Sequence, residues 1–232
     1  MNEINNKRPL QIAIDGPVGS GKGTLAVALA KRLNAVHVYT GGMYRALALA
    51  CKRLGVNLND EKEVFNVLEN SDIDLKIDAG SPLTKVILNG ENVSEEIFFP
   101  EISNITPIVA SYKSVREEMV RRQRKIIGEK RSIVEGRDIA THVIPNADIK
   151  ISLTADVDTR ARRRFNQLID KHVNITLDEV KKDVLERDDR DSKRKDFPLE
   201  ISKDSFLIDT SNDTVEDTVN KVFDELNRRG LI

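Results

Sequence analysis

The segment 16–24 combines residue types and spacing that could do chemistry, because it reads Gly-Pro-Val-Gly-Ser-Gly-Lys-Gly-Thr. The apolar stretch 10–15 precedes it, and a helical pattern of apolar residues follows it. Glycines allow the backbone to curl so that several N–H groups point at one anion, and the positive end of the helix adds to the attraction. Lys22 supplies a mobile positive charge. The segment therefore predicts a loop that holds the phosphates of a nucleoside triphosphate.

One position in this loop departs from the general phosphate-loop pattern. That pattern has Ser or Thr directly after the lysine, where the hydroxyl holds Mg²⁺. This chain has Gly23 there and carries the hydroxyl one residue later, at Thr24, which is similar to the loop of nucleoside monophosphate kinases. We expect Thr24 to reach Mg²⁺ directly or through water; a glycine-rich turn without a ligand is the alternative. The residues expected to contact ATP are Gly16, Pro17, Val18, Gly19, Ser20, Gly21, Lys22, Gly23 and Thr24.

Two more groups of polar residues follow predicted strands. The strand 36–39 runs into Thr40-Gly41-Gly42-Met43-Tyr44-Arg45, and the strand 132–135 runs into Glu135-Gly136-Arg137-Asp138. A hydroxyl, helix N–H groups and arginines at the carboxyl ends of parallel strands favour a second anion, such as an acceptor monophosphate. Glu135 or Asp138 is expected to help order Mg²⁺ and its water. The alternatives are an ordinary helix cap at Thr40 and a surface ion pair.

Two charged runs lie in the second half of the chain. The run 187–194 reads Arg-Asp-Asp-Arg-Asp-Ser-Lys-Arg, and its alternating donors and acceptors suit a phosphate beside ribose hydroxyls or an exocyclic amine. Helical spacing places these on one stripe: Arg187, Arg190, Asp191 and Arg194. A solvated helix face is the alternative. The other run is a basic cluster, Arg160, Arg162, Arg163 and Arg164. It predicts a lid over the transferred phosphoryl group, with nonspecific surface charge as the alternative.

Short apolar strands alternate with helical patterns along the chain. The predicted strands are 10–15, 36–39, 132–135, 149–153 and 205–209, and the last helix covers about 215–227. This alternation predicts an α/β fold, a P-loop NTPase-type parallel sheet flanked by helices on both faces. Because ligands gather at the carboxyl ends of such strands, the polar groups described above are expected to meet there.

The segment 73–111 interrupts this alternation. The stretches 73–77 and 84–88 alternate in polarity, Gly80-Ser81-Pro82 separates them, and Asn89-Gly90 turns the chain again. Helical patterns at 101–111 and 114–127 follow. We predict a core of residues 1–72 and 112–232, a small antiparallel lobe inserted at 73–111, and a short helical lid at about 156–175. A surface hairpin without a role is the alternative for the insertion.

Composition excludes several classes of function. The chain has 232 residues and a formal net charge of −1, so it lacks the basic field that holds nucleic acid. A single cysteine, Cys51, excludes an internal disulfide and fits a reducing compartment. No apolar run reaches transmembrane length, and the first residues lack a signal-peptide core. We therefore expect a cytoplasmic monomer with no membrane or nucleic-acid partner.

The order of the motifs resembles that of bacterial-type cytidylate kinases, which are CMP/dCMP kinases of the P-loop nucleoside monophosphate kinase group. The resemblance covers nearly the whole chain. Its motifs are the segments 16–24, 40–45, 89–97, 115–117, 121–124, 136–138 and 186–191. It implies a core, an acceptor-binding insert and a lid, and transfer of the γ-phosphoryl group of MgATP to CMP or dCMP, giving ADP and CDP or dCDP.

The resemblance also implies roles for single residues. Arg45, Arg137 and Arg187 would hold the acceptor phosphate with Thr40, and Asp191 and Arg187 would bind the sugar. Arg116, Asp138 and Arg194 would lie at or near the cytosine, and Arg163 and Arg164 would belong to the lid over ATP. The implied catalytic residues are Lys22, Arg137, Arg163 and Arg187. Because the acceptor phosphate is ionised at neutral pH, no general base is needed. The histidines His37, His142 and His172 therefore need no catalytic role.

Four positions depart from the family pattern. Tyr39 stands where an Asp is common, and Ile139-Ala140-Thr141-His142 stands where the pattern continues toward Gly-Thr-Val. Pro107 stands where a small hydroxyl residue faces the base, so Thr106 or Ser111 is expected to substitute, or uracil to be tolerated. Arg162 stands where a residue other than arginine is common. None of the four is Lys22 or a phosphate-binding arginine.

Three other functions remain open from the sequence. One is a kinase for UMP, AMP or a non-nucleotide acceptor. Another is a nucleotide-binding switch that transfers nothing, although a second anion site would have no purpose there. The third is a nucleic-acid-binding module, which the near-zero net charge disfavours.

Overall fold

A computed structural model describes residues 8–77, 84–170 and 173–232. The predicted turn at Gly80-Ser81-Pro82 and the residue His172 lie outside the described residues. No helix in the described part is both long and apolar enough to span a membrane.

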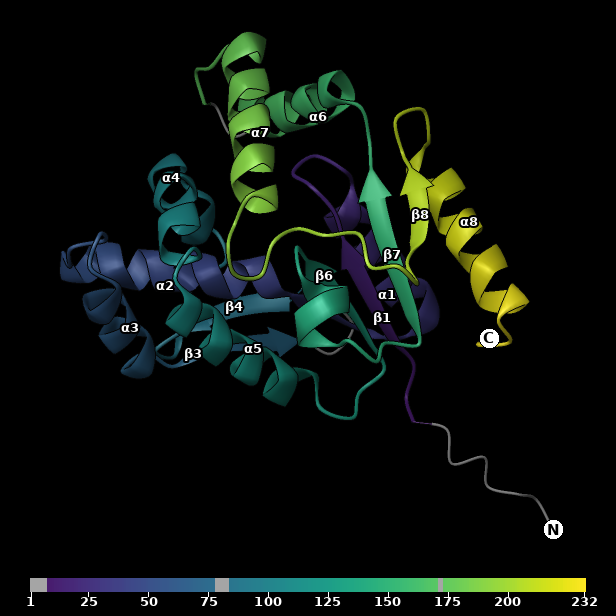
Figure 1. Ribbon diagram of the computed structural model, residues 1–232, viewed down its shortest axis with the longest axis horizontal. Coiled ribbons are helices and arrows are strands. Elements are labelled where there is room, and N and C mark those ends of the chain that lie inside the picture. The colour runs from purple at the N-terminus through teal and green to yellow at the C-terminus, as the bar shows by residue number, and fades with distance from the viewer. Residues whose placement is uncertain (1–7, 78–83, 171–172) are drawn as a thin grey trace.

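The centre of the molecule is a five-stranded parallel sheet in the order β2-β6-β1-β7-β8 (Figure 1). The strands are β1 (Gln11–Asp15), β2 (Val36–Tyr39), β6 (Ser132–Gly136), β7 (Ile149–Thr154) and β8 (Phe206–Asp209). In the parallel register Asp15 lies opposite Gly136, and Tyr39 lies opposite Glu135. The three segments that carry polar groups therefore end side by side at one edge. The predicted strands and fold class are confirmed.

Helices cover both faces of this sheet, so its strands are apolar on both sides. On one face, Ile12 and Ile14 pack with residues of α1 (Lys22–Leu33) and α8 (Val215–Arg228). On the other face, Ala13 and Val38 share a core with residues of α2 (Thr40–Leu54), α3 (Glu61–Glu69) and α5 (Lys113–Ile127). The free cysteine Cys51 is buried in this second core.

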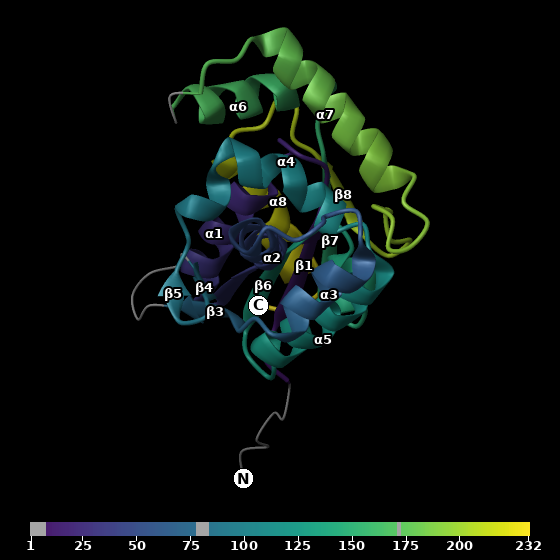
Figure 2. The same cartoon turned by 90° about the vertical axis from the view of Figure 1, so that its left-hand side faces the viewer.

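A small antiparallel sheet lies between β2 and β6 in the sequence, beside the main sheet (Figure 2). Its strands are β3 (Ile73–Ile77), β4 (Thr84–Leu88) and β5 (Glu91–Asn92). Asn89 and Gly90 have φ angles of 49° and 85°, the left-handed conformation that a two-residue hairpin turn requires. A 3₁₀ turn, η1 (Glu96–Phe98), and helix α4 (Pro100–Val109) follow.

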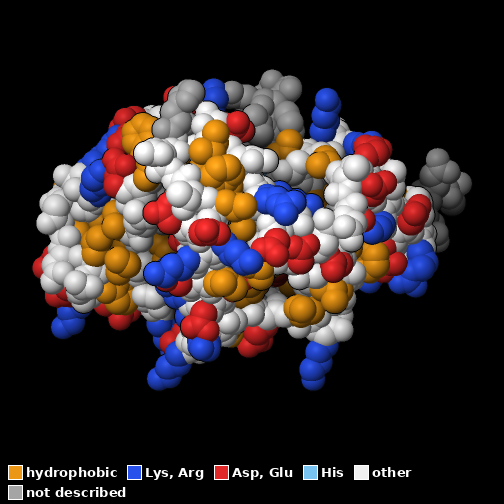
Figure 3. Space-filling model, turned by 90° about the horizontal axis from the view of Figure 1, so that it is seen from above, with side chains coloured by type: hydrophobic (Ala, Val, Ile, Leu, Met, Phe, Trp, Pro, Cys, Tyr) orange, Lys and Arg blue, Asp and Glu red, His pale blue; other side chains and the backbone are white. Residues whose placement is uncertain are grey.

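Two helices, α6 (Val157–Ile169) and α7 (Leu177–Ser192), lie above the carboxyl ends of the strands (Figures 1 and 2). Side-chain oxygens cap both N-termini: Asp156 accepts from the N–H of Thr159, and Thr176 and Glu179 form a capping box. Viewed from above, basic and acidic side chains are interspersed on this face, without a field of one sign (Figure 3).

Candidate active site

A cleft of about 1250 Å³ opens at the carboxyl ends of β1, β2 and β6, between the 16–24 loop, α4, α6 and α7. Nearly every sequence-predicted site residue lines it. The lining residues among them are Val18, Gly19, Ser20, Gly21, Lys22, Gly23, Thr24, Thr40, Arg45, Arg116, Arg137, Asp138, Arg163, Arg164, Arg187, Asp191 and Arg194. Gly16 and Pro17 are not among the lining residues. A Cβ on Gly16 would lie 2.7 Å from the Leu153 carbonyl oxygen, and Pro17 accepts a hydrogen bond from Lys22 Nζ.

The 16–24 loop has the backbone of an anion cradle. Gly19 and Gly21 have φ angles of 77° and 88°, which only glycine adopts at little cost. Helix α1 begins directly at Lys22, so its free N–H groups face the cleft. Burial, and then the charge of Arg137, lowers the pKa of Lys22 to about 7. An anion in the cleft would stabilise the charged form of this ammonium group.

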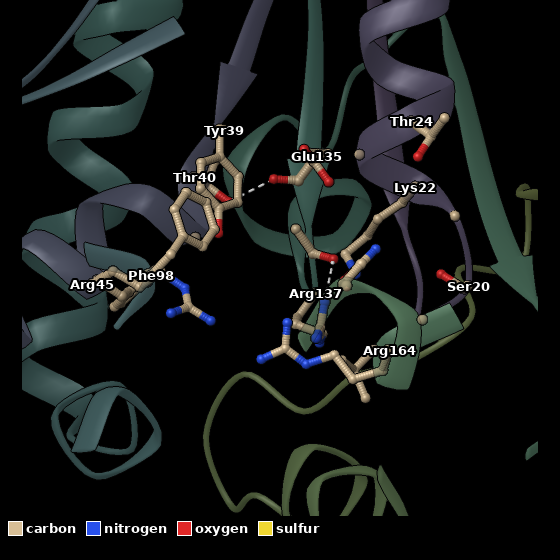
Figure 4. A pocket seen from close by; sticks show the side chains of 18 of the residues that line it. Ser20, Lys22, Thr24, Tyr39, Thr40, Arg45, Phe98, Glu135, Arg137 and Arg164 are labelled. Atoms are coloured by element: carbon tan, nitrogen blue, oxygen red, sulfur yellow. Dashed lines mark hydrogen bonds between the residues drawn. The ribbon is translucent and has the colours of Figure 1, made fainter. Parts of the chain in front are cut away.

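A second concentration of positive charge lies across the cleft from Lys22 (Figure 4). Arg45 donates to the Ile97 carbonyl and to Ser103 Oγ, and its Cζ lies 5.2 Å from the centre of the Phe98 ring. Burial, and then Arg187 and Arg45, lower the pKa of Arg164 to about 10, and the Nε of Arg164 is buried without a partner. An anion placed among these cations would stabilise their charged forms.

Arg137 and Arg194 share the carboxylate of Asp191 between them. Arg137 Nε lies 2.9 Å from Asp191 Oδ2, and Arg194 Nη2 lies 2.5 Å from Oδ1. Burial acts to raise the pKa of Asp191, but the two arginines hold it below its usual value. The charged stripe predicted on 187–194 therefore faces the cleft along α7, rather than only solvent.

Arg116 and Asp138 form a buried ion pair at the end of the cleft near α5. Arg116 Nη2 lies 2.6 Å from Asp138 Oδ1, and the side chains are only 3% and 6% exposed. Arg116 Nε and Asp138 Oδ2 are buried without partners. Unpaired polar atoms of a buried pair carry a desolvation cost that a polar ligand can offset.

Glu135 is the carboxylate of this edge that faces the 16–24 loop. A Cβ on Gly23 would lie 3.2 Å from Glu135 Oε1, and His37 Nε2 lies 3.0 Å from the same oxygen. Asp138 is paired with Arg116, and Asp15 accepts the backbone N–H groups of Ile139 and Ala140. In the described residues no three His, Cys, Asp or Glu side chains cluster as metal ligands.

The hydroxyl of Thr40 holds two strand ends together. It donates to the Glu135 carbonyl over 2.7 Å. A phosphate oxygen can only accept, so in this conformation Thr40 would meet a phosphate through the N-terminus of α2 rather than through its hydroxyl hydrogen.

The four arginines of α6 have different partners, and only two of them line the cleft. Arg160 is turned away from the cleft and binds both carboxylate oxygens of Asp188, at 3.0 and 2.6 Å. Arg162 is exposed and is not a lining residue. Arg163 donates to the Thr210 hydroxyl and carbonyl. Of this cluster, only Arg163 and Arg164 are therefore placed where they could cover a phosphoryl group, whereas Arg160 and Arg162 are not. The partnership of Arg160 with Asp188 had no signal in the sequence, because it joins two helices.

Two of the four departures from the family pattern, Tyr39 and Pro107, line the cleft. Tyr39 stacks on Phe98 with ring centres 6.0 Å apart, which joins β2 to η1. Pro107 and Thr106 both line the cleft, whereas Ser111 is exposed and does not. The Thr106 hydroxyl donates to the Ile102 carbonyl over 2.6 Å, so towards a ligand it is an acceptor. The segment Ile139–Val143 forms a π-helical turn next to Asp138.

The family model and the curated relatives that match this chain point to one family. A family model described as cytidylate kinase matches residues 12–228. Relatives named cytidylate kinase include those of Leuconostoc mesenteroides (42% identity over 91% of this chain and 94% of the relative), Clostridioides difficile (43%, 94% and 98%) and Fusobacterium nucleatum (44%, 90% and 93%). A solved structure of an uncharacterized protein from Eubacterium ventriosum shares the fold, with a TM-score of 0.50 at 14% identity, over 94% of this chain and 98% of that one. Because the family model matches residues 12–228 and these relatives are 42–44% identical, the chain belongs to the cytidylate kinase family.

Proposed function

We propose that this protein transfers the γ-phosphoryl group of ATP to CMP or dCMP, giving ADP and CDP or dCDP. The observation that carries the proposal is the pair of anion sites facing each other across one cleft. The 16–24 loop with Lys22 forms one, and Arg45, Arg137 and Arg187 form the other, with Arg164 of α6 close to Arg187 and Arg45. A donor and an acceptor that both carry phosphate need two such sites, whereas a nucleotide switch needs one.

The acceptor phosphate would lie among Arg45, Arg137 and Arg187, with the N-terminus of α2 at Thr40. Arginine suits this task because its planar donors match phosphate oxygens in pairs. Asp191, already charged between Arg137 and Arg194, would accept hydrogen bonds from the sugar hydroxyls.

The base would be read by the ion pair of Arg116 and Asp138, with Arg194 nearby. Asp138 Oδ2 is a free buried acceptor and fits the exocyclic amine of cytosine. Uracil presents a carbonyl oxygen at that position, and two facing acceptors repel. A site built to pair with a donor rejects the analogue that lacks it more strongly than an apolar pocket rejects an extra methylene.

The residues at the 16–24 loop fit Mg²⁺, which prefers oxygen ligands and keeps several waters. Thr24 carries an exposed hydroxyl at the cleft, and the Glu135 carboxylate faces Gly23, so these two would hold the ion directly or through water. When bound, Mg²⁺ offsets negative charge on the donor phosphates.

The chain's own contribution to the reaction is positioning and charge neutralisation. Lys22 and Arg137 would offset charge on the transferred group, and Arg163 and Arg164 would cover it from α6. No side chain has to remove a proton, because the acceptor phosphate is ionised at neutral pH. Closing the cleft would exclude water, which competes as an acceptor.

We also propose the division into a core, 1–72 and 112–232, an insert at 73–111 and a lid at about 156–175. The proposal includes a cytoplasmic monomer that binds neither nucleic acid nor membranes. The near-neutral net charge supports the absence of a nucleic-acid partner, and the free, buried Cys51 fits a reducing compartment such as the cytoplasm. Light scattering at the working concentration tests the monomer.

The deciding experiment is ADP release by the purified protein with MgATP and, separately, CMP, dCMP, UMP, AMP or no acceptor. Release that depends on CMP and dCMP supports the proposal. Equal release with UMP would mean a broader pyrimidine kinase, which Pro107 in the cleft makes worth testing. ATP binding without acceptor-dependent release would favour a switch and refute the proposal.

A further inference from the structure

The guanidinium of Arg116 lies over two aromatic rings. Its Cζ is 5.3 Å from the centre of the Tyr44 ring and 5.1 Å from the centre of the Phe197 ring. Phe197 contacts His142 in turn, with ring centres 4.4 Å apart and planes tilted by 49°. The stack Tyr44–Arg116–Phe197–His142 thus joins α2, α5, the loop after α7 and the π-helical turn. Cations and aromatic faces attract most strongly when both are shielded from water, as Arg116 is here.

The backbone of Phe197 is held in a costly conformation. Its φ is 55°, a region that bulky side chains rarely adopt. Two contacts hold this loop: within it, Arg194 Nη1 donates to the Phe197 carbonyl over 3.2 Å, and the Leu199 N–H donates to the carbonyl of Asp191 on α7 over 2.8 Å. Both anchors come from residues of the proposed sugar and base site. This strained backbone conformation of Phe197 places its phenyl ring against the guanidinium of Arg116.

Phe197 itself is not among the residues that line the cleft, whereas Arg116 and Asp138 are. Arg116 is otherwise fixed by Asp138 Oδ1 at 2.6 Å and by the Ala110 carbonyl at 3.1 Å. These contacts hold two of its nitrogens and leave the guanidinium free to tilt about the line between them. The rings of Tyr44 and Phe197 lie against the guanidinium and restrict that tilt.

We infer that Phe197 is a positioning residue for base selectivity, which holds Arg116, and through it Asp138, in the orientation that distinguishes cytosine from uracil. The inference rests on the proposed function. It assigns a purpose to His142, which backs the Phe197 ring and lies in one of the segments that depart from the family pattern.

The test compares two substitutions that remove the ring with two controls. Phe197→Leu keeps bulk, and Phe197→Asn suits the left-handed backbone, so the pair separates loss of the ring from relief of strain. Phe197→Tyr keeps the aromatic face. Phe223→Leu is the matched control, because Arg32 lies over the Phe223 ring at 5.8 Å outside the cleft. Calorimetry without ATP gives the dissociation constants of CMP and UMP for each variant, and thermal melting gives its stability.

We expect the ratio of UMP to CMP dissociation constants to fall about tenfold in Phe197→Leu and Phe197→Asn, in line with loss of one shielded cation–π contact. Phe197→Tyr and Phe223→Leu should keep the wild-type ratio, and KM for ATP should not change in any variant. His142→Ala should lower the ratio by a smaller factor, and it serves if both ring-removing variants fail to fold.

Two results would overturn the inference. If CMP and UMP weaken equally in Phe197→Leu and Phe197→Asn, or if only the melting temperature falls, Phe197 serves stability alone. Such a result would leave the proposed function intact, because the wild type would still prefer CMP. A wild type that binds neither nucleotide would refute the proposed function and this inference with it.

Discussion

Arg160 provides the sharpest test of how the cleft is held together. It donates to both carboxylate oxygens of Asp188 on α7 and to the carbonyl oxygens of Val18 and Ala155. A Cβ on Gly19 would lie 2.6 Å from the Arg160 carbonyl oxygen, so α6 packs directly on the 16–24 loop. The pair therefore joins the proposed lid, the donor loop and the helix of the proposed acceptor site.

The coupling energy of this pair follows from its burial. The side chain of Arg160 is 6% exposed and that of Asp188 is 28% exposed. Exposed ion pairs are worth about 0.2–1 kcal/mol, and breaking a fully buried pair costs about 3–5 kcal/mol. The intermediate burial and the bidentate geometry place the coupling between Arg160 and Asp188 at about 2 kcal/mol.

The assay is a double-mutant cycle in urea, with Arg160→Met, Asp188→Ala and both together. The matched control is the pair of Asp189 with Lys193, the C-cap residue of the same helix, whose side chains are 60% and 75% exposed. We expect about 2 kcal/mol of coupling for the first pair and under about 0.5 kcal/mol for the second. KM for ATP should rise more than KM for CMP in Arg160→Met. Equal coupling in the two pairs would refute the reasoning, because burial would then make no difference.

Three further predictions concern the cleft and the sheet. Lys22→Ala should lower kcat at least about a hundredfold with an unchanged melting curve, and near-normal turnover would show that the 16–24 loop does not hold the donor. Arg164→Ala should lower kcat about a hundredfold or more, whereas Arg162→Ala, on the exposed side of the same helix, should stay within about twofold; similar losses would mean that the cluster acts only through its total charge. Burial raises the pKa of Asp15 from 3.8 to about 6, so the folded state binds this proton more tightly than the unfolded state. The stability that this group contributes is present below about pH 4 and is lost as the pH rises through about 6, a change of about 3 kcal/mol. Relative to Asp15→Asn, the wild type should therefore be less stable in urea at pH 7 than at pH 4, and a pH-independent difference would contradict the shift.

The strands and the main helices, and their order along the chain, could be predicted from local sequence patterns alone. The strands and the helix starts follow from local periodicity, glycine turns and capping residues, which act over a few residues and need no tertiary partner. The ends of parallel strands meet at one edge, so Lys22, Arg45 and Arg137 could be placed in one site before any distance was known. The resemblance to a family then supplied the acceptor, which the phosphate loop alone does not specify.

The tertiary structure decided which charged groups face ligand and which face each other. Arg160 and Arg164 look alike in the sequence, but a turn of helix separates them, so one meets Asp188 and the other the cleft. The stack of Phe197 on Arg116 depends on packing between a loop and a distant helix, for which no local pattern exists. Local patterns fix what a segment becomes, whereas the partner of a long side chain depends on the packing of elements far apart in the chain.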